Sequence, residues 1–334
     1  MASNMAKRHI KFFRYYKEWI ETYKKYQISE ITYSKYDLTY RYLKKVHPDL
    51  YLDELTRQKV QMIINKYGET HEIETSKDFL HRLQAPLRDA AYEGWVSKDP
   101  TYKVVPTSRI PHKVTRAKYL EADQAEKLER VLEKDHSIQS VMCDFDLRTG
   151  LRFAEVLGLT PADIDFQKKT IDINKTWDYK KGTDSDFMPT KNKFSNRIIT
   201  IDDKAMHDLQ YMMFGVKQDE PIFVKALTIA AQSKVSDRQP RQKYKKYVAV
   251  YNSTINVKLI EWCEKAGVPR ISFHGLRHTH ASLLIANGVS IQSVADRLGH
   301  ADTTTTQKVY IHLLKKLKAK DDQKILGVMN GLGE

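Results

Sequence analysis

The chain has 334 residues, of which 56 are lysine or arginine and 42 are aspartate or glutamate, giving a formal net charge of +14. This excess indicates a polyanionic partner, although excess lysine that only keeps the surface soluble is the alternative. Nucleic acid fits better than a membrane, because no apolar run is long enough to span one and none resembles a signal peptide. The two cysteines, Cys143 and Cys263, are far apart and predict buried core thiols in a reducing cytoplasm.

The N-terminal part of the chain predicts a small helical bundle. Aromatic residues interleaved with lysines over residues 10–26 recur at helical spacing, and this pattern favours a core face over a base-stacking surface. A second helix is predicted from Thr32, and a third follows Thr56, a natural N-cap. A fourth helix is predicted after these three, and the short connections between the four helices predict a bundle domain over residues 1–97.

The fourth helix is predicted over residues 74–95, where Pro86 should kink the helix or split it in two. Residues 98–118 contain three prolines and no helical period, so they predict an extended basic linker. An exposed connector without a partner is the other interpretation, and the charge favours nucleic-acid contact. The basic candidates in this linker are Lys103, Arg109 and Lys113.

Residues 119–334 predict a second domain. Helical spacing resumes at Leu120, and a further helix is predicted between Ser137 as its N-cap and Gly150 as its stop. The region 162–202 is rich in predicted strands, because apolar residues alternate in it. Helices are predicted again after Asp203. The fold class expected for the whole chain is therefore mainly α with a small antiparallel β-sheet.

The stretch from His274 to Tyr310 contains two short amphipathic helices. Asn287-Gly288 should end the first helix, Ser290 should cap the second, and Gly299 should stop it. His274 and Arg277 are three positions apart and therefore project from the same face of one turn. His300 directly follows the predicted glycine stop.

Two imidazoles, one guanidinium and one phenol suit a phosphate better than a metal. The arginine fork matches two non-bridging phosphate oxygens and keeps its charge at any working pH. A tyrosine can attack phosphorus and later leave as a phenoxide, which conserves the energy of the broken bond. Histidines donate to the developing charge or move protons near neutral pH.

Three motifs, in the same order and spacing, resemble those of the tyrosine recombinases, the phage-integrase family. Thr149–Leu159 (TGLRFAEVLGL) resembles box I, and Lys191–Ile199 (KNKFSNRII) resembles the β-hairpin signature, with Asn192 where threonine is common. Lys193 is therefore an alternative to Lys191 as the lysine of that signature. Three further matches together resemble box II, and they are His274-x-x-Arg277, Leu298-Gly299-His300 and Tyr310.

The resemblance implies a core-binding bundle domain followed by a catalytic domain. It implies a site-specific DNA recombinase that integrates or excises a mobile element through a 3′-phosphotyrosine, as in integrases of Gram-positive phages and conjugative elements. Tyr310 would be the nucleophile. Arg152, Arg277 and His300 would hold the non-bridging oxygens, His274 would aid proton transfer, and Lys191 would protonate the leaving 5′-oxygen. Glu155 is expected to support Arg152 rather than take part in the chemistry.

The partners implied are double-stranded DNA, further copies of the chain in a tetrameric synapse joined through the C-terminal tail, and accessory DNA-bending or directionality factors. We expect no metal and no nucleotide cofactor, and a bacterial cytoplasmic location. Family members often carry a further N-terminal domain that binds arm sites, and we expect none before Ile10. Other expected DNA contacts are Ser34 and Lys35 at a predicted helix start, and Arg241 and Lys243 in a basic run.

Three alternatives remain open from the sequence. Ile291–Gly299 followed by a polar helix resembles a helix-turn-helix, which would suit a non-catalytic DNA-binding regulator. A type IB topoisomerase would share the phosphotyrosine chemistry without exchanging partner strands. A metal-dependent hydrolase could use three histidines of the same helix as ligands, although no acid pair stands at ligand spacing: His274, His278 and His280.

Overall fold

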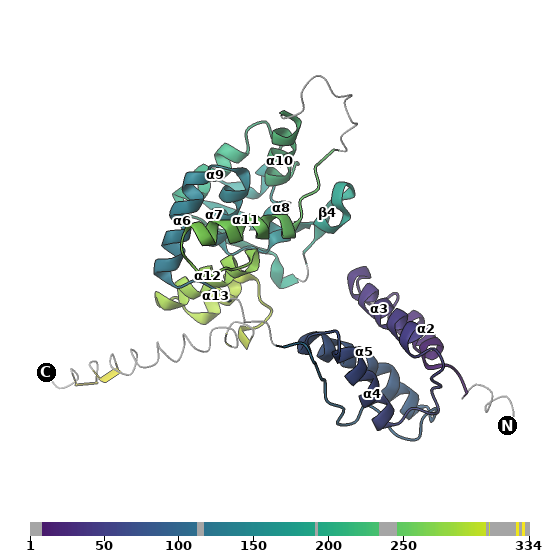
Figure 1. Ribbon diagram of the computed structural model, residues 1–334. Helices are drawn as coiled ribbons and strands as arrows, with labels where there is room; N and C mark the ends of the chain where they lie inside the picture. The colour runs from purple at the N-terminus through teal and green to yellow at the C-terminus, as the bar shows by residue number, and fades with distance from the viewer. Residues whose placement is uncertain are drawn as a thin grey trace. The chain divides into compact units, whose positions relative to one another are not determined.

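The computed structural model describes residues 9–111, 117–190, 193–233, 246–304, 307, 325–326 and 329–330. The chain divides into two compact units, Met1–Thr115 and Arg116–Glu334 (Figure 1). Helices dominate both units, and the strands lie in the second, which confirms the expected fold class. Among the described residues, no helix combines the length and the apolar character needed to cross a membrane.

Within its described residues, 9–111, the first unit has four α-helices, which are α2 (Phe12–Tyr23), α3 (Glu30–Val46), α4 (Arg57–Gly68) and α5 (Ile73–Tyr92). The aromatic face of α2 is buried among the other helices, as expected, and Tyr16 and Ile20 are fully buried. Thr56 caps α4 by accepting the backbone N–H of Lys59. α3 begins at Glu30, capped by Ser29, rather than at the expected Thr32.

Of the two outcomes expected at Pro86, a kink or a split, the split does not occur, because α5 runs as one helix through the proline. Proline cannot donate to the carbonyl four residues earlier, which here belongs to Arg82. The hydroxyl of Tyr16 donates to that Arg82 carbonyl at 3.5 Å, and the hydroxyl of Tyr15 donates to the Pro86 carbonyl at 2.9 Å. Two tyrosine hydroxyls of α2 therefore donate to carbonyls of α5, one that lies a turn before the proline and one that belongs to the proline itself.

The chain that follows α5 returns along α4 in extended form. The Gln61 side chain bonds both the N–H and the carbonyl of Val105, at 2.9 and 2.8 Å. The N–H of Arg109 donates to the carbonyl of Gly68 at 2.8 Å. A Cβ on Gly68 would collide with the backbone of Thr107, so glycine allows this close approach. Residues 98–111 of the predicted linker are thus attached to the first unit.

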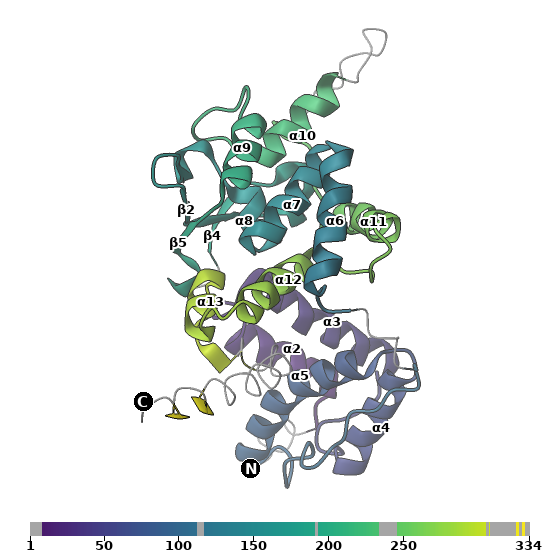
Figure 2. The same ribbon diagram turned by 90° about the vertical axis from the view of Figure 1, so that its left-hand side faces the viewer.

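The second unit has eight α-helices among its described residues. They are α6 (Ala122–Asp135), α7 (Ile138–Thr149), α8 (Phe153–Gly158), α9 (Asp203–Met212), α10 (Ile222–Ser233), α11 (Asn252–Lys265), α12 (Phe273–Ala286) and α13 (Ile291–Leu298). α7 is central and packs against α6, α9, α10, α11 and α12 (Figure 2). Its residues Met142, Cys143 and Phe145 are fully buried, and Cys263 of α11 is buried as well. The prediction that both thiols lie in the core is confirmed.

The part of the sequence between α8 and α9 forms two small antiparallel sheets. One has the order β1-β2-β5, formed by β1 (Ile164–Asp165), β2 (Thr170–Ile173) and β5 (Arg197–Thr200). The register pairs the buried Ile171 with the buried Ile199, so one face joins the core. The other sheet pairs β3 (Lys175–Trp177) with β4 (Phe187–Pro189) and was not predicted. These strands have three residues each, too few to show a clear period of two.

Candidate active site

Three parts of the second unit that are distant in the sequence meet at the turn that follows α13. They are the loop between α7 and α8, the helix α12, and Leu298–His300. α12 and α13 lie side by side in this region (Figure 2). The expected caps are all present: Ser290 begins α13, and Gly150 and Gly299 end α7 and α13 in the left-handed conformation. Local sequence signals therefore fix the turns that bring the site together.

Arg277 of α12 is the buried centre of the site. Its side chain is 2% exposed and donates from Nη1 to the carbonyl of Gly150 at 2.7 Å and from Nη2 to the carbonyl of Leu298. Burial, followed by the nearby charge of Arg152, lowers the pKa of Arg277 to about 9, so the guanidinium remains charged at neutral pH. Its carbonyl partners orient the fork and leave its positive charge unneutralised.

Arg152 stands at the N-terminus of α8 and is more open, with 29% of its side chain exposed. Its Nη2 donates to the carbonyl of Gly299 at 3.1 Å, and its Nη1 donates to Glu155 Oε1 at 2.6 Å. Glu155 also accepts the backbone N–H of Arg152 at 2.9 Å, as the sequence predicted. The arginines of boxes I and II therefore bond to adjacent carbonyls of the same turn.

His300 completes this turn. Its Nε2 lies 3.2 Å from Nη2 of Arg277. Because arginine nitrogens only donate, Nε2 is the acceptor and the ring hydrogen lies on Nδ1. Burial, then the charges of Arg277 and Arg152, lower the pKa of His300 to about 4. The imidazole is therefore neutral at physiological pH.

His274 lies in the first turn of α12, where its side chain is exposed. Partial desolvation by the surrounding protein, then the charges of Arg277 and Arg152, lower its pKa. Its ring meets the ring of His278 edge-on, with 4.6 Å between centroids. Burial, then the neighbouring His274, lowers the pKa of His278 to about 4. Neutral His274 is thus available to exchange a proton near the arginines.

Two partly buried side-chain contacts involving Arg197 and Arg297 were not predicted from the sequence. Arg197 of β5 is 7% exposed and pairs with Glu155, with 2.9 Å between Nη2 and Oε2. Arg297 of α13 donates from Nε to Nε2 of His280 at 2.8 Å, while Nδ1 of His280 bonds the carbonyl of Leu147. Both ring nitrogens of His280 thus have protein partners, so His280 serves the packing of α12, α7 and α13 rather than a metal. Within the described ranges, no group of three or more His, Cys, Asp and Glu side chains could hold a metal ion.

The structure brings Arg152, Arg277, His300 and His274 to one place. Lys191 and Tyr310 lie outside the described residues, as do Lys113, Arg241 and Lys243. The other expected DNA contacts belong to the first unit, where Ser34 and Lys35 are exposed on α3 and Lys103 and Arg109 are exposed after α5. The hydroxyl of Ser34 donates to the carbonyl of Ile31 at 2.8 Å.

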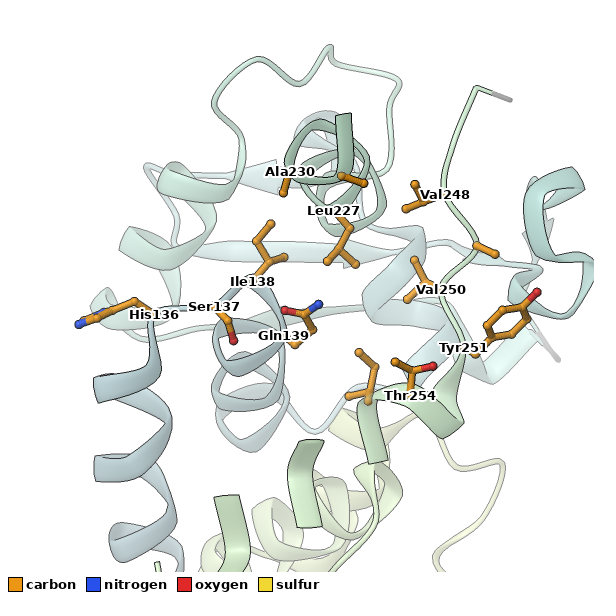
Figure 3. A pocket seen from close by; sticks show the side chains of 13 residues that line it. His136, Ser137, Ile138, Gln139, Leu227, Ala230, Val248, Val250, Tyr251 and Thr254 are labelled. Carbon is orange, nitrogen blue, oxygen red and sulfur yellow. The ribbon is translucent and has the colours of Figure 1, made fainter. Parts of the chain in front are cut away.

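A pocket of about 500 Å³ lies elsewhere in the second unit, between the start of α7, α10 and the chain that enters α11 (Figure 3). Ile138, Leu227 and Val248 supply much of its apolar wall. None of the 13 residues drawn along this wall is an arginine or a lysine. Its chemistry therefore does not suit a phosphate, unlike that of the arginine cluster.

The site combines the positively charged guanidinium groups of Arg152 and Arg277 with neutral imidazoles. This combination suits an anion that has several oxygen atoms to accept hydrogen bonds. A phosphodiester meets this description, because each arginine fork can donate to a non-bridging oxygen. The carbonyl partners fix the arginines before any ligand arrives, which reduces the reorganisation needed when charge develops on those oxygens. The arrangement of these groups therefore suits a phosphodiester.

Comparisons with known proteins agree with this chemistry. Residues 118–316 match the phage integrase family, and residues 11–104 match the phage integrase SAM-like domain. The integrase of Staphylococcus phage L54a is 25% identical over 308 residues, covering 84% of this chain and 82% of that protein. The ICEBs1 integrase of Bacillus subtilis (strain 168) is 26% identical over 234 residues, covering 67% of this chain and 57% of that protein.

Solved structures show the same fold. The Tn1549 transposon integrase in complex with a circular intermediate DNA superposes with a TM-score of 0.70 at 17% identity, covering 89% of this chain and 94% of that chain. A lambda integrase dimer bound to a COC′ core site gives a TM-score of 0.62 at 15% identity, covering 92% of this chain and 79% of that chain.

Proposed function

This chain belongs to the phage integrase family, and we propose that it cuts and rejoins DNA at specific sites through a 3′-phosphotyrosine, integrating or excising a mobile element. As a member of this family it is a tyrosine recombinase, an enzyme that transfers DNA strands. The observation that carries the proposed chemistry is the meeting of Arg152, Arg277 and His300 at the turn Leu298–His300. These are the groups that two of the sequence motifs contribute, and their charge and geometry suit a scissile phosphate.

In the proposed reaction, the phenol oxygen of Tyr310 attacks phosphorus, and the bond from phosphorus to the 5′-oxygen breaks. Lys191 gives a proton to the leaving 5′-oxygen, and His274 takes the phenol proton. Arg152 and Arg277 hold the non-bridging oxygens, with help from His300. Rejoining reverses these steps with a different 5′-hydroxyl, so the bond energy is conserved and no nucleotide is consumed.

The proposed substrate is double-stranded DNA, held by both units. The net charge of +14 and the exposed cations Lys35, Lys103 and Arg109 support this assignment. We assign residues 1–97 to core binding, residues 98–118 to a basic linker and residues 119–334 to catalysis. On this assignment Ser34, with Lys113, Arg241 and Lys243, adds backbone contacts.

We further assign a homo-oligomeric complex on DNA, a tetramer at synapsis, in which the segment after Tyr310 contacts a neighbouring copy. Apolar residues recur in this segment, among them Leu313, Leu314 and Leu317. Accessory DNA-bending or directionality factors and a bacterial cytoplasmic location belong to the same proposal. Lambda integrase, one of the structural neighbours, has been solved as a tetramer on a Holliday junction.

A supercoiled plasmid that carries the element's own junction tests the proposal in the presence of EDTA. We expect a covalent protein–DNA adduct on a denaturing gel with the native chain and none with Tyr310→Phe. DNA binding without any adduct on a verified site would instead favour the helix-turn-helix regulator. An adduct with relaxation but no recombinant product between two sites would favour a type IB topoisomerase, and a reaction abolished by EDTA would favour the metal-dependent hydrolase.

A further inference from the structure

We infer that Arg197 is a positioning residue, which neutralises Glu155 so that the charge of Arg152 remains available to the scissile phosphate. This inference rests on the proposed function for its catalytic consequence. It concerns a side chain that the chemistry above does not use. Its basis is the arrangement of Arg152, Glu155 and Arg197, which we call the Arg–Glu–Arg trio.

Arg197 bonds the protein through all of its side-chain nitrogens. Its side chain is 7% exposed, and each of its three nitrogens has a partner. Nε donates to the carbonyl of Arg297 at 2.6 Å, Nη1 to the carbonyl of Ser195 at 2.8 Å, and Nη2 to Glu155 Oε2 at 2.9 Å. Any effect on catalysis therefore passes through Glu155 or through the α13 turn.

Glu155 is a single carboxylate placed between two arginines. It is 1% exposed. Its Oε1 accepts from Nη1 of Arg152 at 2.6 Å and lies 3.3 Å from Nη1 of Arg197, and its Oε2 accepts from Nη2 of Arg197. Two guanidinium charges against one carboxylate leave the trio with one net positive charge. Arg152, with its partly exposed side chain, is the member that can offer this charge to a ligand.

Removing Arg197 changes this charge balance. The buried carboxylate would keep Arg152 as its one ion-paired arginine, and attraction between such a pair is strong where water is excluded. Arg152 would then be held as a closed ion pair, and the trio would carry no net charge. Burial raises the pKa of Glu155, but the charges of Arg197 and Arg152 outweigh it and lower the pKa, so Glu155 is ionised at neutral pH.

Arg197 also connects this charge balance to the position of His300. Its Nε holds the carbonyl of Arg297 in the last turn of α13, three residues before the imidazole. A Cβ on Gly299 would lie 3.1 Å from Nη1 of Arg197, so the turn packs directly on the guanidinium. A purely structural role for Arg197 would rest on this second contact alone, and the experiment must separate the two roles.

The test compares Arg197→Gln, Glu155→Gln and the double variant by the initial rate of adduct formation on a verified junction. We expect Arg197→Gln to lose about 10²-fold, the size of effect seen when one preorganised donor is lost. The double variant should recover at least about tenfold relative to Arg197→Gln, because removing the carboxylate frees Arg152 again. A structural role predicts no recovery, since each change would only add to the damage.

Arg297 provides the matched comparison. It is another arginine at the junction of α13 and β5, bonded to His280 and to the carbonyl of Thr200, and it makes no bond to Glu155. Adding Glu155→Gln to Arg297→Gln should therefore give no recovery. Equal recovery in both backgrounds, or none in the Arg197 background with the fold intact by urea unfolding, would overturn the inference.

Binding of inorganic phosphate, measured by the shift in thermal unfolding, gives a second measurement that does not depend on recombination. We expect Arg197→Gln to bind phosphate about tenfold more weakly than the native chain and the double variant to regain the loss. If the native chain forms no adduct but phosphate binding follows this order, the proposed function fails and the inference about Arg197 stands. Equal phosphate binding by all variants would contradict the inference whatever the adduct assay shows.

Discussion

The side chain of Arg152, at the start of α8, donates a hydrogen bond of 3.1 Å to the carbonyl of Gly299, which lies 147 positions later in the chain. The buried Arg277 bonds the preceding carbonyl, that of Leu298. Two arginines from different motifs are therefore fixed by consecutive carbonyls of one turn. Because carbonyl groups orient a guanidinium without cancelling its charge, Arg277 remains available to an anionic ligand. Arg152 also pairs with Glu155, but it shares that carboxylate with Arg197.

The first prediction concerns the two arginines of the proposed phosphate site. Arg152→Lys and Arg277→Lys should each slow adduct formation by about 10²–10³-fold, because lysine cannot reproduce a bidentate fork. Arg277→Lys should also lower the free energy of unfolding by about 1–3 kcal/mol, since a lysine leaves a buried carbonyl unsatisfied. Arg130→Lys, at an exposed position on α6, is the control. If Arg152→Lys and Arg277→Lys both formed adducts at the rate of the native chain, the assignment of this phosphate site would be contradicted.

The second prediction concerns the turn that carries His300. Gly299 has φ = +66°, and a Cβ there would lie 3.1 Å from the carbonyl oxygen of Phe194. Gly299→Ala should therefore displace the turn and reduce adduct formation at least about tenfold. Gly288→Ala is matched for backbone strain, with φ = +85°, but its Cβ would meet nothing within 4 Å. Equal losses in both variants would mean that strain, and not the packing around His300, limits the reaction.

The third prediction concerns pH and the structural histidine His280. Burial, then the charge of Arg297, lowers the pKa of His280 to about 3, against about 6.5 in an unfolded chain. Between these values the unfolded state binds more protons, so this group's contribution to stability is complete above pH 6.5 and is lost as the pH falls. His280 should contribute about 2 kcal/mol to the loss of unfolding free energy between pH 7.5 and pH 5.

Urea unfolding at these two pH values measures this contribution. His280→Gln should be less stable than the native chain at pH 7.5, and the difference should shrink at pH 5. The control is His81→Gln, which changes one histidine at an exposed position of α5, in the first unit. A stability difference between the native chain and His280→Gln that is the same at both pH values would rule out a neutral buried His280.

The fourth prediction concerns the proposed DNA contacts of the first unit. The Arg109 side chain is 80% exposed, and its Nη1 lies 3.9 Å from Glu69. Arg109→Gln should weaken DNA binding and reduce the slope of log K against log salt by about 0.9, the value for one lost phosphate contact. Lys77→Gln is the control, because Glu74 already pairs with that lysine at 2.6 Å. An unchanged salt slope for Arg109→Gln would remove Arg109 from the contacts.

Local chemistry explains which parts of the structure could be predicted. Ser290, Gly150 and Gly299 act within one turn of the chain, so their roles as caps and stops were correctly predicted from the sequence. At Pro86 the sequence left a kink or a split open, and the helix continues without a split, with Tyr16 of another helix donating to the Arg82 carbonyl. A local rule for proline cannot include a partner 66 positions away.

In the candidate site, too, some features could be predicted from local sequence and others depend on distant partners. The motifs predicted which arginines and histidines belong together, and the described structure brings Arg152, Arg277, His274 and His300 into one cluster. The pairing of Arg197 with Glu155 joins β5 and α8 across 42 positions, and no local pattern encodes it. The roles of the catalytic residues, including Lys191 and Tyr310, stay predictions that the experiments above test.

The most direct test of the account is to identify the bond between protein and DNA. Adducts would be trapped on a nicked duplex that carries the junction, digested with trypsin and sequenced by mass spectrometry, with the DNA ends tested by exonucleases. The account predicts one linkage, from the Tyr310 phenol oxygen to a 3′-phosphate, with a free 5′-hydroxyl on the other strand end. DNA attached to another residue, or through a 5′-phosphate, would contradict it.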